Sequence, residues 1–286
     1  MLPQICAEIF GVSHTNLYLC QPKTPLNMTE LRLLRYNMGD GVKAFSTTRH
    51  GGYSHGRYGE FNINAYCGDE EENIRRNRQA LCTRLGIGND RLLMPHQVHE
   101  TRAAIVDEEL LALTAEQRRE TLEGCDAMMT NLRGVCIGVS TADCIPILLY
   151  DVAHRAVAAV HAGWRGTVAR ITEKTVAAMT ATYGTNPLQV RAQIGPGISC
   201  ESFEVGDEVY EAFAREGFDM KPISRREEKW HIDLPECNRR QLLASGLKEE
   251  NISMAAICTY RQAADFFSAR RLGIRSGRIF TAIMLQ

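Results

Sequence analysis

Residues 135–166 read VCIGVSTADCIPILLYDVAHRAVAAVHAGWRG and contain three short apolar runs, at 135–139, 145–150 and 156–160. Apolar residues follow one another in these runs, without the alternation of a half-exposed strand. Such runs are typical of strands that are buried on both faces of a sheet. We therefore expect three buried strands, the first two separated by residues 140–144.

A helix and a further strand follow this stretch. Residues 167–183 carry apolar side chains at helical spacing and are followed by Gly184, which is typical of a helix C-terminus. Residues 188–194 are rich in strand-forming side chains. The order of strand, glycine-rich turn, helix and strand over 156–194 predicts one βαβ unit with a right-handed crossover.

The other predicted elements do not alternate regularly. Capping residues and periodicity predict helices at 69–85, at 207–216 and from Asp233 onward. Residues 108–122 are compatible with a helix or with a long charged loop, and strands are expected at 101–106 and 252–259. These elements together predict an α+β fold of mixed β-sheets packed with helices.

Length and charge limit the function classes. The chain has 286 residues, with 33 Lys and Arg against 34 Asp and Glu. A formal net charge of −1 supplies no positive field, so we expect no nucleic-acid partner. The length allows one large domain or two small ones, and no linker-like stretch divides the chain. We expect a single domain over 1–286, with residues 1–40 as an N-terminal extension to a unit at 44–286.

Compartment is predicted from the N-terminus, the apolar stretches and the cysteines. MLPQICAEIF lacks the basic and apolar regions of a signal peptide. The longest apolar stretch, 135–162, is interrupted by Asp143, Asp151 and Arg155, so we expect no membrane span. Ten cysteines without a CxxC pair predict a reducing, cytoplasmic environment.

Cys144 and His161 lie at junctions between buried runs and turns. If the runs at 145–150 and 156–160 pair as a hairpin, both side chains meet at one sheet edge. His99, just before the run at 101–106, is a candidate third ligand. Two histidines and a cysteine with an open position form a plausible zinc site, or a copper site if an axial ligand exists.

Spacing alone leaves this metal site open. His99, Cys144 and His161 are separated by 45 and 17 residues, so no compact ligand pair exists. A buried cysteine with two ordinary hydrogen-bonding histidines is the simpler interpretation. A third possibility makes Cys144 a nucleophile with His161 as its base. His96 competes with His99, and in a strand the two would lie on opposite faces.

Arg49 and Arg165 are candidate anion-binding residues. Both have glycine neighbours, which let a ligand approach the backbone. The planar guanidinium suits phosphate or carboxylate, and Arg165 precedes the predicted helix at 167–183, whose N-terminus favours an anion. Two surface arginines remain the alternative.

Several segments occur in the order seen in one protein family. They are Thr48-Arg49 with Gly51-Gly52, Phe61-Asn62-Ile63-Asn64, Gln97-Val98-His99, Thr141-Ala142-Asp143-Cys144-Ile145-Pro146, His161-Ala162-Gly163-Trp164-Arg165-Gly166, Ile194-Gly195-Pro196-Gly197-Ile198, and Phe266-Phe267-Ser268 with Arg270-Arg271 and Ser276-Gly277-Arg278. From about Ala44 to its C-terminus the chain resembles the YfiH/YlmD-type, laccase-domain proteins. Tyr66 and Ala269 depart from the usual pattern of this family.

The resemblance implies a fold, a site and an activity. It implies an α+β arrangement that has been compared with bacterial toxin cysteine hydrolases. It implies that His99, Cys144 and His161 bind a metal, usually zinc, and act in catalysis. For substrate binding we expect Arg49, Asn64 and Arg165. The implied reactions are phosphorolysis of adenosine, inosine and 5′-methylthioadenosine and hydrolytic deamination of adenosine, with small-molecule purine nucleosides and phosphate as partners.

Three other function classes are considered. A copper-dependent polyphenol oxidase needs several coppers, and the chain has only eight histidines. A Cys-His hydrolase or peptidoglycan-editing enzyme would use Cys144 and His161 without metal. A non-enzymatic binding module is the last alternative.

Overall fold

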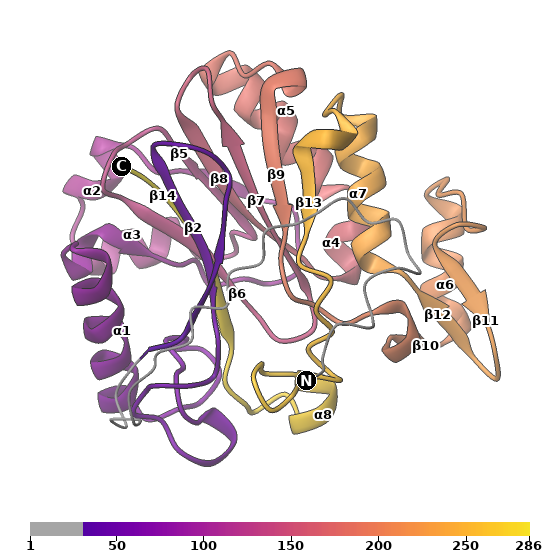
Figure 1. Ribbon diagram of the computed structural model, residues 1–286, viewed down its shortest axis with the longest axis horizontal. Helices are drawn as coiled ribbons and strands as arrows, with labels where there is room; N and C mark the ends of the chain where they lie inside the picture. Colours follow the sequence, from indigo (N-terminus) through magenta and orange to yellow (C-terminus); the bar gives the residue numbers. More distant parts are fainter. Residues whose placement is uncertain (1–30) are drawn as a thin grey trace, which may run out of the picture.

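A computed structural model describes residues 31–286 (Figure 1). Its strands are β1 (Leu33–Tyr36), β2 (Val42–Thr47), β3 (Leu92–Leu93), β4 (Ala103–Ile105), β5 (Ala127–Thr130), β6 (Cys136–Thr141), β7 (Ile145–Asp151), β8 (Ala156–Ala162), β9 (Val190–Ile194), β10 (Glu204–Val205), β11 (Ser224–Arg226), β12 (Trp230–Ile232), β13 (Ile252–Met254) and β14 (Ile279–Leu285). Its α-helices are α1 (Glu71–Leu85), α2 (Glu108–Ala112), α3 (Ala115–Thr121), α4 (Trp164–Val168), α5 (Ile171–Tyr183), α6 (Asp207–Arg215), α7 (Leu234–Ala244) and α8 (Ala269–Leu272).

Two mixed sheets form the centre of the described structure. One has the order β1-β2-β14-β6-β3 and the other the order β13-β9-β7-β8-β5-β4, while β10-β12-β11 form a small third sheet. The predicted α+β class with mixed sheets is therefore confirmed.

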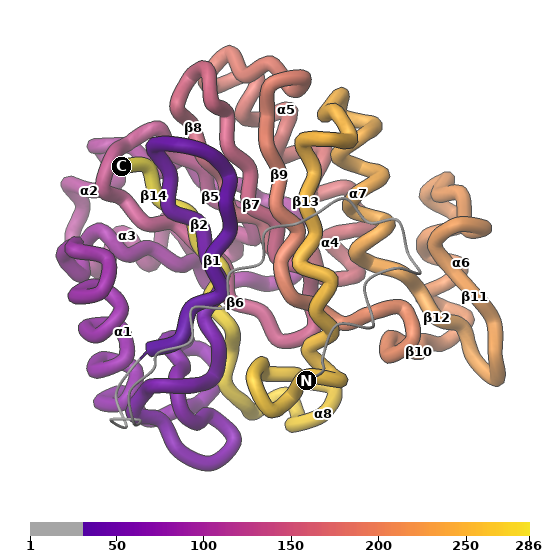
Figure 2. Tube along the Cα trace, viewed as in Figure 1, coloured from indigo at the N-terminus to yellow at the C-terminus, as the bar shows by residue number. Residues whose placement is uncertain are grey.

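The two large sheets pack face to face, with helices on their outer faces (Figure 2). Along β8, Val157 and Ala159 join a core shared with β6 and β14, whereas Ala158 and Val160 pack with α5 and α7. The outer face of the five-stranded sheet packs against Leu81 and its neighbours on α1. Both faces of the central strands are buried, which explains their continuous apolar sequence.

The predicted hairpin is confirmed. β7 and β8 pair antiparallel, with Ile145 opposite Ala162 and Pro146 opposite His161. β8 and β9 run parallel to each other, as the βαβ prediction requires, but each pairs antiparallel with β7, which lies between them.

Two helix predictions need correction. The helix expected at 167–183 is two helices, because Arg170 has a left-handed backbone (φ 61°) that ends α4 and begins α5. Trp164 and Arg165 consequently lie inside α4. Asp69 does not cap α1, because Glu70 holds the N-cap position and its side chain forms no capping hydrogen bond. The Asp69 carboxylate accepts hydrogen bonds from Ser54, Asn62 and the Glu70 N–H.

Other boundaries also differ from the sequence-based expectation. Residues 108–122 form the two short helices α2 and α3, separated by Leu113 and the capping residue Thr114. The strand expected at 252–259 ends at Met254, shortly before Ala256, which has a φ of 53°. The start of the run at 188–194 is a 3-10 turn.

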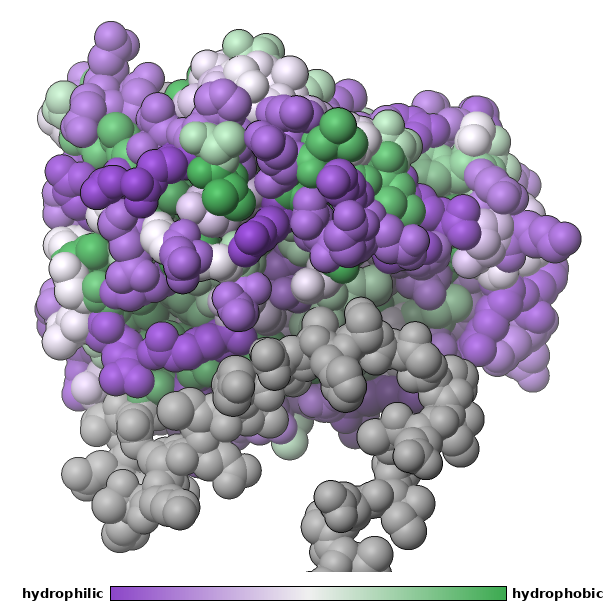
Figure 3. All heavy atoms as spheres, turned by 45° about the horizontal axis from the view of Figure 1, so that its top comes forward, coloured by the Kyte–Doolittle hydropathy of each residue, from purple (hydrophilic) through white to green (hydrophobic). Residues whose placement is uncertain are grey.

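The predicted N-terminal extension falls largely outside the described residues. Of residues 1–40, the structure describes only those from Leu31 onward, and among them Leu33–Tyr36 form β1 at a sheet edge. In the described part of the chain, no helix has both the length and the apolar character required to cross a bilayer. On the face seen in Figure 3, hydrophobic residues lie in small groups among hydrophilic ones.

Candidate active site

Cys144 and His161 meet where the β7–β8 hairpin is open. Cys144 directly precedes β7, and His161 is the second-last residue of β8. The antiparallel register places these strand ends beside each other, as the apolar runs predicted. His161 is buried and Cys144 is half-buried, so the hairpin core holds them in place while Cys144 keeps access to solvent.

His99 comes from the loop between β3 and β4. Its backbone has a φ of 67°, a left-handed conformation that is uncommon outside glycine and persists where surrounding contacts hold it. The backbone N–H groups of Val98, His99 and Glu100 donate to the Asp126 carboxylate over 3.2, 3.0 and 2.8 Å. The segment that holds His96 and His99 is a loop, so the alternation considered for a strand does not apply to it.

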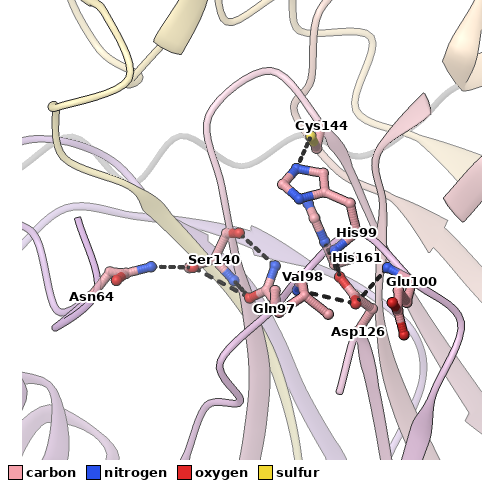
Figure 4. Close-up of polar contacts among 9 residues, drawn as sticks. All are labelled: Asn64, Gln97, Val98, His99, Glu100, Asp126, Ser140, Cys144 and His161. Atoms are coloured by element: carbon pink, nitrogen blue, oxygen red, sulfur yellow. Dashed lines mark hydrogen bonds and ion pairs between the residues drawn. The ribbon is translucent and has the colours of Figure 1, made fainter. Parts of the chain in front are cut away.

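Asp126 also orients His161 (Figure 4). The Nδ1 atom of His161 lies 2.7 Å from a carboxylate oxygen of Asp126, which leaves Nε2 as the free ring nitrogen. Burial opposes ionisation of Asp126, but the bonds from His161 and the backbone N–H groups hold its pKa below the usual range. One carboxylate therefore positions both histidines of the site.

Asp126 is the main site residue that the sequence-based prediction missed. It stands directly before the buried strand β5, just as Cys144 stands before β7. A polar residue at the start of an apolar run is thus the sequence signal that could have identified Asp126 as well.

The three side chains are close enough to share one ion. Their ligand atoms lie within 4.8 Å of one another, and Cys144 Sγ is 3.8 Å from His99 Nε2. In a tetrahedral zinc site, sulfur and nitrogen ligands are separated by roughly 3.6 Å. The arrangement fits zinc, and the Asp126–His161 contact is the kind of second partner that metal-bound histidines have.

The two imidazoles favour a thiolate at Cys144. Burial raises the pKa of the Cys144 thiol, but the neighbouring His161 and His99 outweigh it and lower the pKa to about 6. Burial lowers the pKa of His161, but Cys144 and Asp126 raise it to about 9. A thiolate is the form in which cysteine binds metal and acts as a nucleophile.

These residues lie in the wall of a cavity of about 1190 Å³. Amide, hydroxyl, aromatic and guanidinium side chains line it, together with the three candidate ligands. Besides these ligands, the lining includes Tyr58, Asn64, Tyr66, Gln97, Ser140, Trp164, Phe203, Arg270, Arg275 and Arg278. Asn64 donates to the Ser140 hydroxyl over 2.6 Å, so the structure brings Asn64 to the same cavity as His99, Cys144 and His161.

The comparison with known families agrees with this arrangement. Residues 43–286 match the family described as multi-copper polyphenol oxidoreductase laccase. The chain belongs to this family. The resemblance inferred from the sequence is thereby confirmed.

Two relatives of this laccase-family chain carry the names of purine nucleoside enzymes. A purine nucleoside phosphorylase of Bacteroides thetaiotaomicron is 49% identical over 248 residues, which cover 86% of this chain and 92% of that protein. Adenosine deaminase RL5, from an unknown prokaryotic organism, is 43% identical over 260 residues, covering 90% of this chain and 99% of that protein.

A solved structure supports the fold. The crystal structure of the Bacillus licheniformis hypothetical protein YfiH has a TM-score of 0.83 and 27% sequence identity, covering 89% of this chain and 96% of that one. The mixed α+β arrangement is thus shared with YfiH. The comparison of the fold with cysteine hydrolases stays a prediction.

The laccase-family chain holds one candidate metal centre within residues 31–286. The other described histidines that make polar contacts bind groups outside this centre. His50, His96 and His154 contact carboxylates, and His231 contacts a backbone carbonyl. A site for several coppers requires several such ligand groups, and the described residues hold one candidate group.

Arg49 and Arg165 are not among the residues that line the cavity. The Arg49 guanidinium donates to the carbonyls of Gly59 and Ala263 over 3.0 and 2.7 Å. Arg165 is exposed and lies over the Trp164 ring, 4.2 Å from its centroid. Trp164 itself lines the cavity. The assignment of both arginines to substrate stays a prediction.

Gly163→Ala is expected to weaken metal binding by about tenfold or more, because small displacements of site groups have large effects. A Cβ at Gly163 would lie 2.8 Å from His99 Cδ2 and 3.1 Å from Cys144 Sγ. It would therefore push two candidate ligands apart. Zinc content after dialysis, measured by elemental analysis, tests this.

Gly206→Ala is the matched control for this substitution. Gly206 precedes α6 as Gly163 precedes α4, with nearly the same backbone angles. The nearest atoms to an added methyl group there belong to the Glu208 carboxylate, at the end of an exposed side chain. Full zinc retention in Gly163→Ala would contradict the proposed geometry.

Proposed function

We propose that the protein is a zinc-dependent purine nucleoside enzyme. It would convert adenosine, inosine and 5′-methylthioadenosine, with phosphate, to the free base and ribose 1-phosphate or methylthioribose 1-phosphate, and would hydrolyse adenosine to inosine. The observation that carries the proposal is the close grouping of His99, Cys144 and His161 in the wall of a large cavity lined by both polar and aromatic side chains. The names of the phosphorylase and deaminase relatives support the substrate class.

His99, Cys144 and His161 would hold the zinc, with an open position toward the cavity. Zinc with three protein ligands acts as a Lewis acid and lowers the pKa of a coordinated water to about 7. Asp126 keeps a proton on Nδ1 of His161, so that Nε2 faces Cys144. The negative charge of Asp126 also keeps the ligating imidazole electron-rich.

The cavity walls supply groups suited to a nucleoside. Aromatic rings such as Phe203 and Trp164 offer flat apolar surfaces to a purine. Gln97 is held by Ser140, since its amide donates to the Ser140 carbonyl over 2.9 Å and accepts from the Ser140 N–H over 2.8 Å. Asn64 remains our proposed substrate-binding amide.

Arg275→Ala is expected to raise the KM for phosphate by roughly tenfold or more and to leave adenosine deamination unchanged. Of the two reactions, only phosphorolysis uses phosphate. Among the cavity arginines, Arg270 and Arg278 donate to backbone carbonyls, whereas Arg275 is exposed and has no hydrogen bond within the described chain. Steady-state kinetics of both reactions test this.

Arg49→Ala is the variant to compare with Arg275→Ala. Because Arg49 bonds two backbone carbonyls, we expect its loss to reduce both activities together with thermal stability. A selective rise in the phosphate KM for Arg49→Ala, with no effect of Arg275→Ala, would instead assign phosphate binding to Arg49.

The decisive experiment is product analysis after incubation with adenosine and phosphate. We expect adenine with ribose 1-phosphate, inosine, and one equivalent of zinc by elemental analysis. Absence of all three products would refute the proposal. Copper in place of zinc, with oxidation of a phenol, would favour the polyphenol oxidase alternative.

A cysteine hydrolase is the second candidate, and one observation favours it. Cys144, His161 and Asp126 are arranged as a nucleophile, a base and an orienting carboxylate. Such an enzyme would remain active after treatment with a chelator. The zinc enzyme would lose deamination and recover it when zinc is added back.

A further inference from the structure

A second cleft lies between α1 and α3, which are neighbours at the left of the molecule in Figure 1. Its volume is about 550 Å³. Three arginines and several apolar side chains line it, and we call it the arginine cleft. The lining residues used below are Arg78, Arg118, Arg119, Tyr66, Asp90 and Leu92.

The charge of the arginine cleft is not neutralised by the protein. Arg78, Arg118 and Arg119 face a single lining carboxylate, that of Asp90. None of the three arginines forms an ion pair with a residue in the described part of the chain. Three guanidinium groups gathered around one cleft repel one another, so an anion bound there would be stabilised.

Two of the guanidinium groups are held in position by backbone carbonyls. Arg78 is half-buried and donates to the Leu92 carbonyl over 2.8 Å. Arg118 donates to the carbonyls of Leu113 and Asp90 over 3.1 and 2.8 Å. These contacts fix the side chains without cancelling their charge, which is the preorganisation that an anion site requires.

Tyr66 is the one residue that lines both the arginine cleft and the active-site cavity. Its ring stacks on His96, with 4.1 Å between the centroids. Burial and the Glu123 carboxylate raise the pKa of Tyr66, while Arg119 and Arg78 oppose the rise, so both guanidinium groups act on this phenol. A ligand in the arginine cleft would therefore contact a wall of the active-site cavity.

We propose that the arginine cleft binds a phosphate-bearing ligand, with the phosphate at Arg78, Arg118 and Arg119. The cleft is much larger than a phosphate ion, and Tyr66 and the half-buried Met94, which also lines it, supply aromatic and apolar surface. These dimensions favour the phosphate ester of a nucleotide over free inorganic phosphate. The inference concerns binding alone and does not depend on the proposed reactions.

Calorimetric titration with AMP, inorganic phosphate and adenosine, at constant ionic strength, tests the proposal. Arg119→Glu reverses an exposed charge that has no hydrogen bond within residues 31–286, and should weaken AMP binding by about tenfold or more. Arg84→Glu is the matched control, because Arg84 is an exposed arginine on α1 outside the cleft. It should leave the affinity unchanged.

The outcomes separate the ligand sources and the two proposals. AMP binding tighter than phosphate, with the AMP affinity lowered in Arg119→Glu, identifies a nucleotide ester. Equal affinities for AMP and phosphate, both lowered in Arg119→Glu, identify free phosphate. Undiminished AMP binding to Arg119→Glu, or equal weakening by Arg84→Glu, overturns the proposal. Adenosine turnover by Arg119→Glu reports on the active site separately, and we expect it to match that of the unsubstituted protein.

Discussion

Cys144→Ser is expected to lose bound zinc and, with it, adenosine deamination by roughly a thousandfold or more. Serine offers a hydroxyl that stays protonated near neutral pH, so the site loses the anionic sulfur ligand whose charge partly neutralises the metal. Elemental analysis and the rate of inosine formation, measured on the same preparations, test this expectation.

Cys200→Ser is the control, because Cys200 is also a half-buried free cysteine but does not line the cavity. Loss of activity in Cys144→Ser alone would not distinguish a ligand from a nucleophile. Mass spectrometry of the unsubstituted protein during turnover supplies the distinction. A covalent adduct on Cys144 in zinc-free, active protein would replace the zinc mechanism with a cysteine hydrolase.

Asp126→Asn is expected to lower zinc affinity by about 10–100-fold. The substitution keeps the shape of the side chain but removes its negative charge. His161 and the backbone of Val98, His99 and Glu100 all donate to the Asp126 carboxylate. The new amide N–H would therefore face other donors and lack an acceptor. Competition with a chromophoric chelator measures the affinity.

Asp151→Asn is a close control for this substitution. Asp151 is a buried carboxylate that accepts from two backbone N–H groups and lies 2.8 Å from Nδ1 of His154, at the far end of β7. We expect it to affect stability and not zinc. If Asp126→Asn binds zinc as tightly as the unsubstituted protein, Asp126 does not orient the ligands.

Part of the site could be predicted because it depends on local pattern. Three apolar runs predicted buried strands, and a short turn between two of them predicted the hairpin that brings Cys144 beside His161. The position of His99 was not set in this way. Its left-handed backbone and its loop depend on Asp126, which is 27 residues away along the chain.

The arginines show the limit of local inference most clearly. Glycine neighbours suggested that Arg49 and Arg165 bind an anion, which stays a prediction; the sequence does not say which acceptors the fold places near a guanidinium. For Arg49 these are the carbonyls of Gly59 and Ala263, the second from a segment distant in sequence. The cavity arginines, such as Arg275, come from the segment before β14.

The sequence by itself determined the fold class, the central hairpin and the meeting of Cys144 with His161. These follow from hydrophobic periodicity and short turns, which act between residues close in the chain. Tertiary structure decided the rest. Asp126 became the common support of both histidines, and the arginine cleft formed between α1 and α3. Each depends on polar partners from separate elements, whose positions are set only when the two sheets and their helices have packed.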